Sequence, residues 1–214
     1  MAWSFISAAS GVSLNASNCT TGAFNTSGAT LIVVFIGRVN GTGTISDTKS
    51  NTYTPLTAVN RSTIEGQLYY CINPTTDSAL IISWSSSVVP CINAVALSAG
   101  AAITYIAESG GQSTGTTVQP GSLTLNSTDC AVSGFVNGDT AATFTIDTAT
   151  GSRMQAGNAG NGVPTAESYY YGTSGAYNPT WTTSISNAGN VAVMAQFREA
   201  GGSTGNPWYA YAQQ

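Results

Sequence analysis

Leu31-Ile32-Val33-Val34-Phe35-Ile36 is the stretch that decides the fold class. It is a continuous apolar run, rich in β-branched residues, between Gly28 and Gly37, and such a run is typical of a central strand buried on both faces. Further strand-like segments at 67–72, 79–84, 91–97, 103–106, 122–125, 131–136, 143–146 and 191–197 alternate with turn residues. No segment has the capped 3.6-residue periodicity of a helix. The sequence therefore predicts an all-β fold, a two-sheet antiparallel sandwich in a single domain.

The period-2 alternation also predicts a core. We expect seven side chains to be almost fully buried between sheets: Leu31, Val33, Phe35, Leu80, Ile82, Val193 and Phe197.

Composition excludes several classes of function. Hydrophobic residues make up 42% of the 214-residue chain, which is enough for a core, but charged residues make up only 7% and histidine is absent. Without histidine, a histidine-dependent triad and an imidazole metal site are excluded. Five basic residues and a net charge of −4 argue against a nucleic-acid partner.

The amino-terminal residues and the hydropathy argue against a membrane protein. Residues 1–5 lack the basic and apolar regions of a signal peptide, and the apolar run 31–36 is too short to cross a bilayer. We therefore expect synthesis in a host cytoplasm and no membrane partner. The neutral, hydroxyl-rich composition is nevertheless typical of an extracellular surface, and a virion protein reconciles the two.

The four cysteines, Cys19, Cys71, Cys91 and Cys130, contain no C-x-x-C pair. We expect free, buried thiols, because the chain is expected to fold in a reducing compartment. The alternative is a Cys71–Cys91 bridge between two strands.

No domain boundary is evident before residue 199. We expect a β-sandwich domain over 1–199 and a Gly-rich carboxy-terminal arm over 200–214, with long polar loops at 109–121 and 152–166. Residues 15–19 and 126–130 are similar, but the match is too short to indicate a repeat.

The sequence contains no pattern typical of a catalytic site. Residues 111–115 and 201–205 match G-x-S-x-G, but without histidine, and outside a strand-to-helix turn, they cannot be hydrolase elbows. The carboxylates are scattered rather than paired. We expect no catalytic residue, no cofactor, no metal site and no enzymatic activity.

Aromatic residues between 169 and 181 allow two interpretations. Tyr169, Tyr171, Tyr177 and Trp181 lie in a stretch rich in Gly, Ser and Asn, and they could form a glycan platform. The alternative is that alternate rings pack into the core.

The carboxy-terminal arm carries three more large aromatic residues: Trp208, Tyr209 and Tyr211. Such residues are enriched at interface hot spots, so we expect an intersubunit anchor. The alternative is that the arm folds back as a last edge strand.

The order of several phrases resembles a family of jelly-roll sandwich proteins common in phage genomes and bacterial surface proteins. The phrases are MAWSFIS (1–7), TSGATLIVVFIG (26–37), ISDTKSNTYTPL (45–56), LYYCINPTTDSALIISW (68–84), PGSLTL (120–125) and VAVMAQF (191–197). Ser50 stands where the family's D-x-x-G-N-T-Y turn has glycine. The resemblance implies a double-sheet jelly roll in a virion or cell-surface setting, and it assigns no catalytic residue.

Together these observations predict a non-enzymatic structural protein of a phage virion. We expect a capsid decoration or cement protein, or a head or tail fibre component, on the virion surface. Its partners would be other virion proteins of the capsid or tail and copies of itself as a homo-oligomer. The alternatives are a carbohydrate- or receptor-binding module that takes a host-surface glycan, and an extracellular filament subunit.

Overall fold

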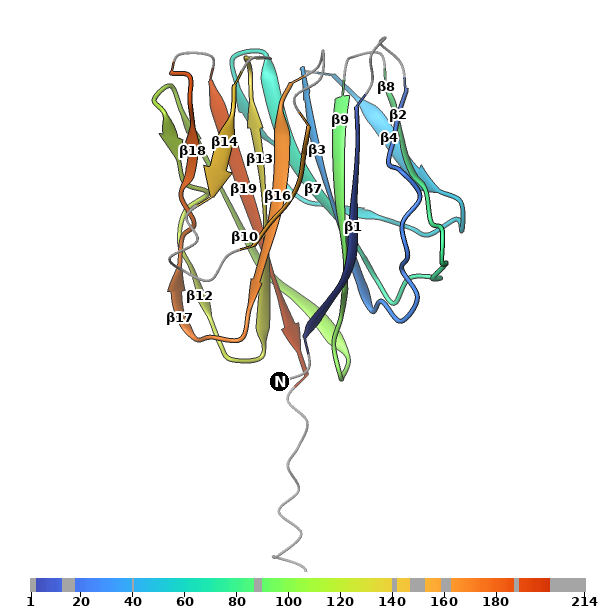
Figure 1. The fold of residues 1–214 in the computed structure, drawn as a ribbon. Helices are drawn as coiled ribbons and strands as arrows, with labels where there is room; N and C mark the ends of the chain where they lie inside the picture. The colour runs from blue at the N-terminus through green and yellow to red at the C-terminus, as the bar shows by residue number, and fades with distance from the viewer. Residues whose placement is uncertain are drawn as a thin grey trace, which may run out of the picture.

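The fold is all-β, as the sequence predicts, but it contains five antiparallel sheets rather than two (Figure 1). This computed structural model describes residues 3–12, 18–39, 41–86, 90–139, 142–146, 153–158, 163–186 and 189–200. These ranges contain no helix, and so none long and apolar enough to cross a membrane. The jelly-roll assignment stays a prediction.

Two large sheets form the middle of the molecule. The first has the order β1 (Ser4–Val12), β9 (Pro90–Ser98), β3 (Leu31–Val39), β7 (Ile64–Ile72) and β5 (Thr54–Pro55), and β6 (Val59–Arg61) also pairs with β7. The second has the order β10 (Ile103–Ser113), β19 (Asn190–Glu199), β13 (Asp129–Asn137), β16 (Thr165–Tyr171) and β15 (Arg153–Asn158). One apolar cluster lies between them and takes side chains from both sheets.

Three small sheets cover the outer faces of the large ones. Sheet β2 (Asn18–Thr20), β8 (Ile82–Ser86), β4 (Gly43–Asp47) packs on the first large sheet through its own apolar cluster. Sheet β11 (Thr117–Val118), β18 (Trp181–Thr183), β14 (Phe144–Ile146) and the pair β12 (Leu123–Leu125), β17 (Gly175–Tyr177) pack on the second. Figure 1 shows these small sheets at opposite sides of the molecule, so the chain forms four β layers.

The predicted core is confirmed. The seven predicted side chains are at most 3% exposed: Leu31, Val33, Phe35, Leu80, Ile82, Val193 and Phe197. Leu80 and Ile82 belong to the outer cluster under β2, β8 and β4, and the other five lie between the large sheets. Strands β3, β9 and β13 are buried on both faces, which explains their nearly continuous apolar sequences.

The chain builds the same arrangement twice. In each half the first strand pairs with the last, and the last pairs with the central strand. Both first strands carry a bulge at the same place, between Phe5 and Ser7 in β1 and between Tyr105 and Ala107 in β10. Contacts between the large sheets also come in matched pairs, β1 against β15 and β10 against β6. The halves are therefore related by an approximate twofold.

Aromatic stacking follows the same twofold. Phe5 stacks on Tyr169 with ring centroids 5.0 Å apart, and Tyr105 stacks on Tyr70 at 5.4 Å. Each stack joins the first strand of one half to the β7 or β16 strand of the other. Matched stacks of this kind close the two side edges of the central core.

The division of the chain into two halves was not predicted from the sequence. The halves meet at residues 99–102, because β10 begins at Ile103. The expected loop at 109–121 is wrong in its first part, since β10 continues to Ser113 through Gly110 and Gly111. Likewise β15 and the start of β16 fall within the expected loop at 152–166. The similar phrases at 15–19 and 126–130 end on strands that are not equivalent, β2 and β13.

Glycine allows the two large sheets to approach closely. The ring of Phe35 on β3 lies against Gly134 on β13, where a Cβ atom would collide with it. Phe35 and Gly134 occupy the same place in the two halves. Phe35 pairs with Leu68 on β7 and Asn93 on β9, and Gly134 pairs with Glu167 and Val193 on the corresponding strands β16 and β19. A large residue in one half thus fills the space left by a small residue in the other.

The two ends of the described chain meet at one end of the molecule. The carbonyl oxygen of Thr128 accepts hydrogen bonds from Trp3 Nε1 at 2.8 Å and from Glu199 N at 3.0 Å. Ala200 N donates to Ala102 O at 2.7 Å. The amino terminus, the carboxy-terminal end of β19 and the connection between halves are therefore neighbours (Figure 1).

Candidate functional sites

The aromatic residues expected to form a glycan platform are distributed over three clusters. Tyr169 is stacked between Phe5 and Tyr171, and Tyr177 stacks on Tyr170 with centroids 4.3 Å apart. Trp181 stacks on Phe135 at 5.3 Å. Tyr169, Tyr177 and Trp181 are buried and Tyr171 is half-buried.

These positions follow the alternative interpretation, in which the rings pack into the protein. The buried rings share no exposed surface, so they offer no common stacking face to a sugar. The predicted anchor residues Trp208, Tyr209 and Tyr211 lie outside the described residues.

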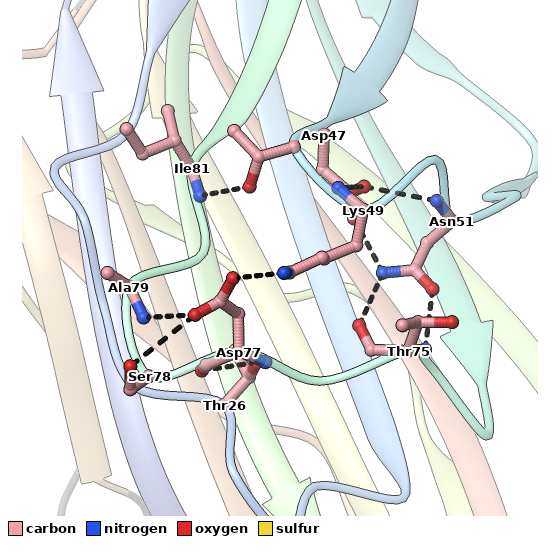
Figure 2. Close-up of polar contacts among 10 residues, drawn as sticks. Thr26, Asp47, Lys49, Asn51, Thr75, Asp77, Ser78, Ala79 and Ile81 are labelled. Atoms are coloured by element: carbon pink, nitrogen blue, oxygen red, sulfur yellow. Dashed lines mark hydrogen bonds and ion pairs between the residues drawn. The ribbon is translucent and has the colours of Figure 1, made fainter.

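The turn that carries the family resemblance is a hydrogen-bonded loop (Figure 2). Asp47 Oδ1 accepts from the backbone of Lys49 and Asn51, and Oδ2 accepts from Asn51 Nδ2 and Tyr53 Oη at 2.8 Å each. Lys49 Nζ in turn lies 2.6 Å from Asp77 Oδ2. The turn therefore fixes the loops after β4 and β7 to each other. Its role in this chain is structural.

Two other ion pairs account for more of the few charges. Arg38 is buried beneath the Trp84 ring and pairs with Glu65. Asp129 is buried and accepts from Arg198 Nε at 2.7 Å. Burial alone would raise the pKa of Asp129, but hydrogen bonds from Arg198, Asn126 and Gln196 hold it below its ordinary value.

The outer faces of the two three-stranded sheets carry rows of uncharged polar side chains. The rows are Asn18–Ser85–Thr44, Thr20–Ser83–Ser46 and Thr117–Thr182–Thr145, each with one residue per strand in direct register. All are exposed except Ser83, which is half-buried. The alternating inward positions bury Trp84 and Trp181. We call these rows the hydroxyl faces.

A notch lies where the edges of the two large sheets meet. It has a volume of about 320 Å³ and is lined by Thr57, Val59, Glu108, Ser109 and Gly110. The Glu108 carboxylate accepts from the Thr57 backbone at 3.1 Å and from its hydroxyl. The notch thus presents a carboxylate, hydroxyl groups and one apolar wall, which can receive a small polar group.

The central core contains a group of polar residues that sequence reasoning missed. Cys91, Asn93, Thr165 and Glu167 are fully buried between the large sheets, and we call them the polar lobe. Asn93 Nδ2 donates to Thr165 Oγ1 at 2.8 Å, whereas Asn93 Oδ1 and both carboxyl oxygens of Glu167 have no hydrogen-bond partner. Burial raises the pKa of Glu167 well above its ordinary value, because it disfavours the charged carboxylate relative to the neutral acid.

The twofold relates this lobe to an apolar one. The counterparts of its members are Val191, Val193, Gly66 and Leu68, which we call the apolar lobe. Nothing in the sequence marks Glu167 as buried, because it stands in an otherwise polar, aromatic stretch. Aligning the sequences of β7 and β16 would have found it, because the counterpart of Glu167 is Leu68, a residue typical of a buried position.

The four cysteines are free and buried, as expected. Cys71 lies opposite Ile32 on one side of β3, and Cys91 lies opposite Gly37 on its other side. A whole strand therefore separates the two thiols, and the alternative bridge is wrong. Burial raises the pKa of Cys19 to about 11 and that of Cys91 to about 12, so neither is a reactive thiolate near neutral pH.

Among the described residues, no group of three His, Cys, Asp or Glu side chains could hold a metal ion. No protein-family model, curated protein or solved structure matches this chain.

Proposed function

We propose that this chain is a non-enzymatic structural protein of a phage virion surface, either a capsid decoration or cement protein or a head or tail fibre component. The observation that carries the proposal is the pair of hydroxyl faces. They are uncharged and rich in exposed hydroxyl groups. Copies that present such faces can sit side by side without electrostatic repulsion.

We also infer that each half is a jelly-roll unit. In the first half β1, β3, β7 and β9 share the large sheet while β2, β4 and β8 form the small outer sheet, and in the second half β10, β13, β16 and β19 share the large sheet while β11, β14 and β18, with the pair β12 and β17, lie outside it. This interleaving of two sheets is the pattern of a double-sheet jelly roll, a fold used in viral capsid and lectin domains. The chain would then contain two such units packed through their large sheets.

The position of the chain ends supports attachment through one end. Trp3 and Ala200 lie at the same end, where residues 201–214 begin. A subunit held there would present the loops at its opposite end outward. The aromatic residues Trp208, Tyr209 and Tyr211 are proposed as the anchor on a neighbouring virion protein.

Charge substitutions on the hydroxyl faces test the main proposal. Thr182→Lys and Ser83→Lys should fold normally, because their side chains point outward, but should reduce the copy number on purified particles by about tenfold. Gln112→Lys, an exposed position on the edge strand β10, is the matched control. Copy number would be measured by quantitative gel analysis of gradient-purified particles. Absence of the wild-type protein from particles would refute the proposal.

Removal of residues 206–214 tests the anchor. We expect assembly on the particle to fail while the melting temperature of the isolated protein stays unchanged. Unchanged occupancy would show that the arm is not an anchor.

A carbohydrate- or receptor-binding role is the second candidate, and the notch at Glu108 favours it. Its carboxylate and hydroxyl groups can accept and donate hydrogen bonds to a sugar, and its walls come from both halves. A glycan array should then give binding that Glu108→Ala removes. An array without binding would exclude this candidate.

A further inference from the structure

The polar lobe joins the two halves through the Thr165 hydroxyl. Asn93 belongs to the first half and Thr165 to the second, and their 2.8 Å hydrogen bond is fully buried. The Thr165 hydroxyl also hydrogen-bonds the Cys91 thiol, which is a buried group of the first half. Two groups with complementary reactivity are therefore held together at a fully buried place.

Each member of the lobe has a distinct chemistry. The Thr165 hydroxyl is a nucleophile, and the Asn93 side-chain amide carbon, bonded directly to the hydrogen-bonding Nδ2, is an electrophile. Glu167 follows Thr165 by two residues on the same face of β16, so its side chain enters the same space. As a buried neutral acid with both oxygens unpartnered, it can give one proton and accept another.

We propose that Asn93 and Thr165 form an intramolecular ester that links the two halves covalently, with Glu167 transferring the protons. Thr165 Oγ forms a bond to Asn93 Cγ, and the Cγ–Nδ2 bond breaks. The hydroxyl proton of Thr165 passes to one carboxyl oxygen of Glu167, while the acid proton of Glu167 passes to Nδ2. Ammonia leaves, and Glu167 ends in its starting protonation state. No oxidant, metal or cofactor is needed.

Burial supplies what this reaction needs. Fixing the two groups against each other replaces a bimolecular encounter. This effect corresponds to an effective concentration of about 10⁵ M or more. Exclusion of water also protects the ester from hydrolysis. Before attack, the Asn93 amide must turn about its Cβ–Cγ bond so that Oγ faces the carbon instead of the nitrogen.

The apolar lobe cannot form an equivalent ester. Its counterparts of Asn93, Thr165 and Glu167 are Val193, Gly66 and Leu68, which contain no nucleophile, amide or acid. One ester per chain is therefore the expected number. The inference is independent of the virion proposal, because it concerns only the folded chain.

Intact-mass spectrometry of the denatured, purified full chain tests the ester. We expect a mass lower than that of the sequence by one ammonia, and fragments that contain residues 93 and 165 as one linked species. Hydroxylamine should separate them. A chain at the full unmodified mass would overturn the proposal.

Three variants identify the reacting groups. Thr165→Val should keep the shape of the site but restore the full mass, whereas Thr165→Ser should retain the linkage. Glu167→Gln should slow linkage after refolding by about 100-fold or more. Persistent loss of ammonia in Thr165→Val would instead indicate a succinimide at an asparagine and would refute the ester.

Discussion

The apolar lobe and the polar lobe occupy equivalent places in one core, yet they are stabilised differently. Leu68 fills its place with apolar contacts, whereas Glu167 fills the same place with a carboxyl group that has no partner. Burying such a group costs free energy that a leucine would not. The comparison teaches that the Glu167 carboxyl group is a stability cost that the apolar contacts of the core offset, whereas Asn93 and Thr165 in the same lobe join the halves.

Truncation of the two counterparts should give the largest difference. Leu68→Ala should lower the free energy of unfolding by about 2–5 kcal/mol, because it leaves a cavity. Glu167→Ala should cost much less, since the lost packing is offset by removing an unpartnered carboxyl group. Urea denaturation measures both. Equal losses would show that the two lobes contribute equally.

The close approach at Gly134 should give the next largest effect. In Gly134→Ala the new Cβ would collide with the Phe35 ring, so we expect a loss of about 1–3 kcal/mol in the free energy of unfolding. Gly22→Ala, at a position with no heavy atom near the new Cβ, is the control. A loss no greater than the control's would mean that the sheets can move apart without cost.

The polar lobe should make stability depend on pH. Because the pKa of Glu167 is higher in the folded than in the unfolded chain, the folded chain keeps a proton that the unfolded chain loses. The contribution of this proton to the free energy of unfolding is complete at a pH below the pKa of Glu167 in the unfolded chain. It then falls by about 1.4 kcal/mol per pH unit as the pH rises towards the folded pKa.

Urea unfolding at a series of pH values between about 5 and 8 measures this slope of the free energy of unfolding against pH. Glu167→Gln should remove it, since an amide does not titrate. Asp129 does not interfere, because its lowered pKa places its contribution at more acid pH. A slope that persists in Glu167→Gln would assign the effect to another group.

The smallest effect concerns a feature of the first half alone. Ser50 has φ of +59°, a left-handed conformation that favours glycine, in the turn fixed by Asp47. Ser50→Gly should therefore raise the free energy of unfolding by less than about 1 kcal/mol, which would appear as a slightly higher melting temperature. Ser50→Ala should bring no gain, and thermal unfolding distinguishes the two. A stabilising alanine would show that backbone strain is not the cause.

Sequence patterns predicted the parts of the fold in which local composition and burial agree. The run 31–36 is apolar on both faces because β3 is covered by a sheet on each side. The first strand was missed because Ser4–Val12 is rich in small polar residues at an edge. The continuation of β10 was missed because Gly110 and Gly111, usual loop residues, serve here for close approach to Val59 and Gln119.

The candidate sites were less predictable because they depend on contacts between distant segments. Tyr169 and Trp181 are aromatic residues in a polar stretch, and sequence alone leaves open whether their rings face water or the core. Glu167 could be recognised only after Leu68 was seen at the equivalent place. Nothing in the sequence brings Asn93 near Thr165, because they meet only where the two halves pack.

The meeting of the chain ends makes the order of the two halves interchangeable. Trp3 and Glu199 share the Thr128 carbonyl, and the connection at 99–102 lies beside Ala200. A circular permutant that begins at residue 102, joins 200 to 3 through a short linker and ends at 99 would keep every strand pairing. Which half is synthesised first is thus a matter of gene order, not of architecture.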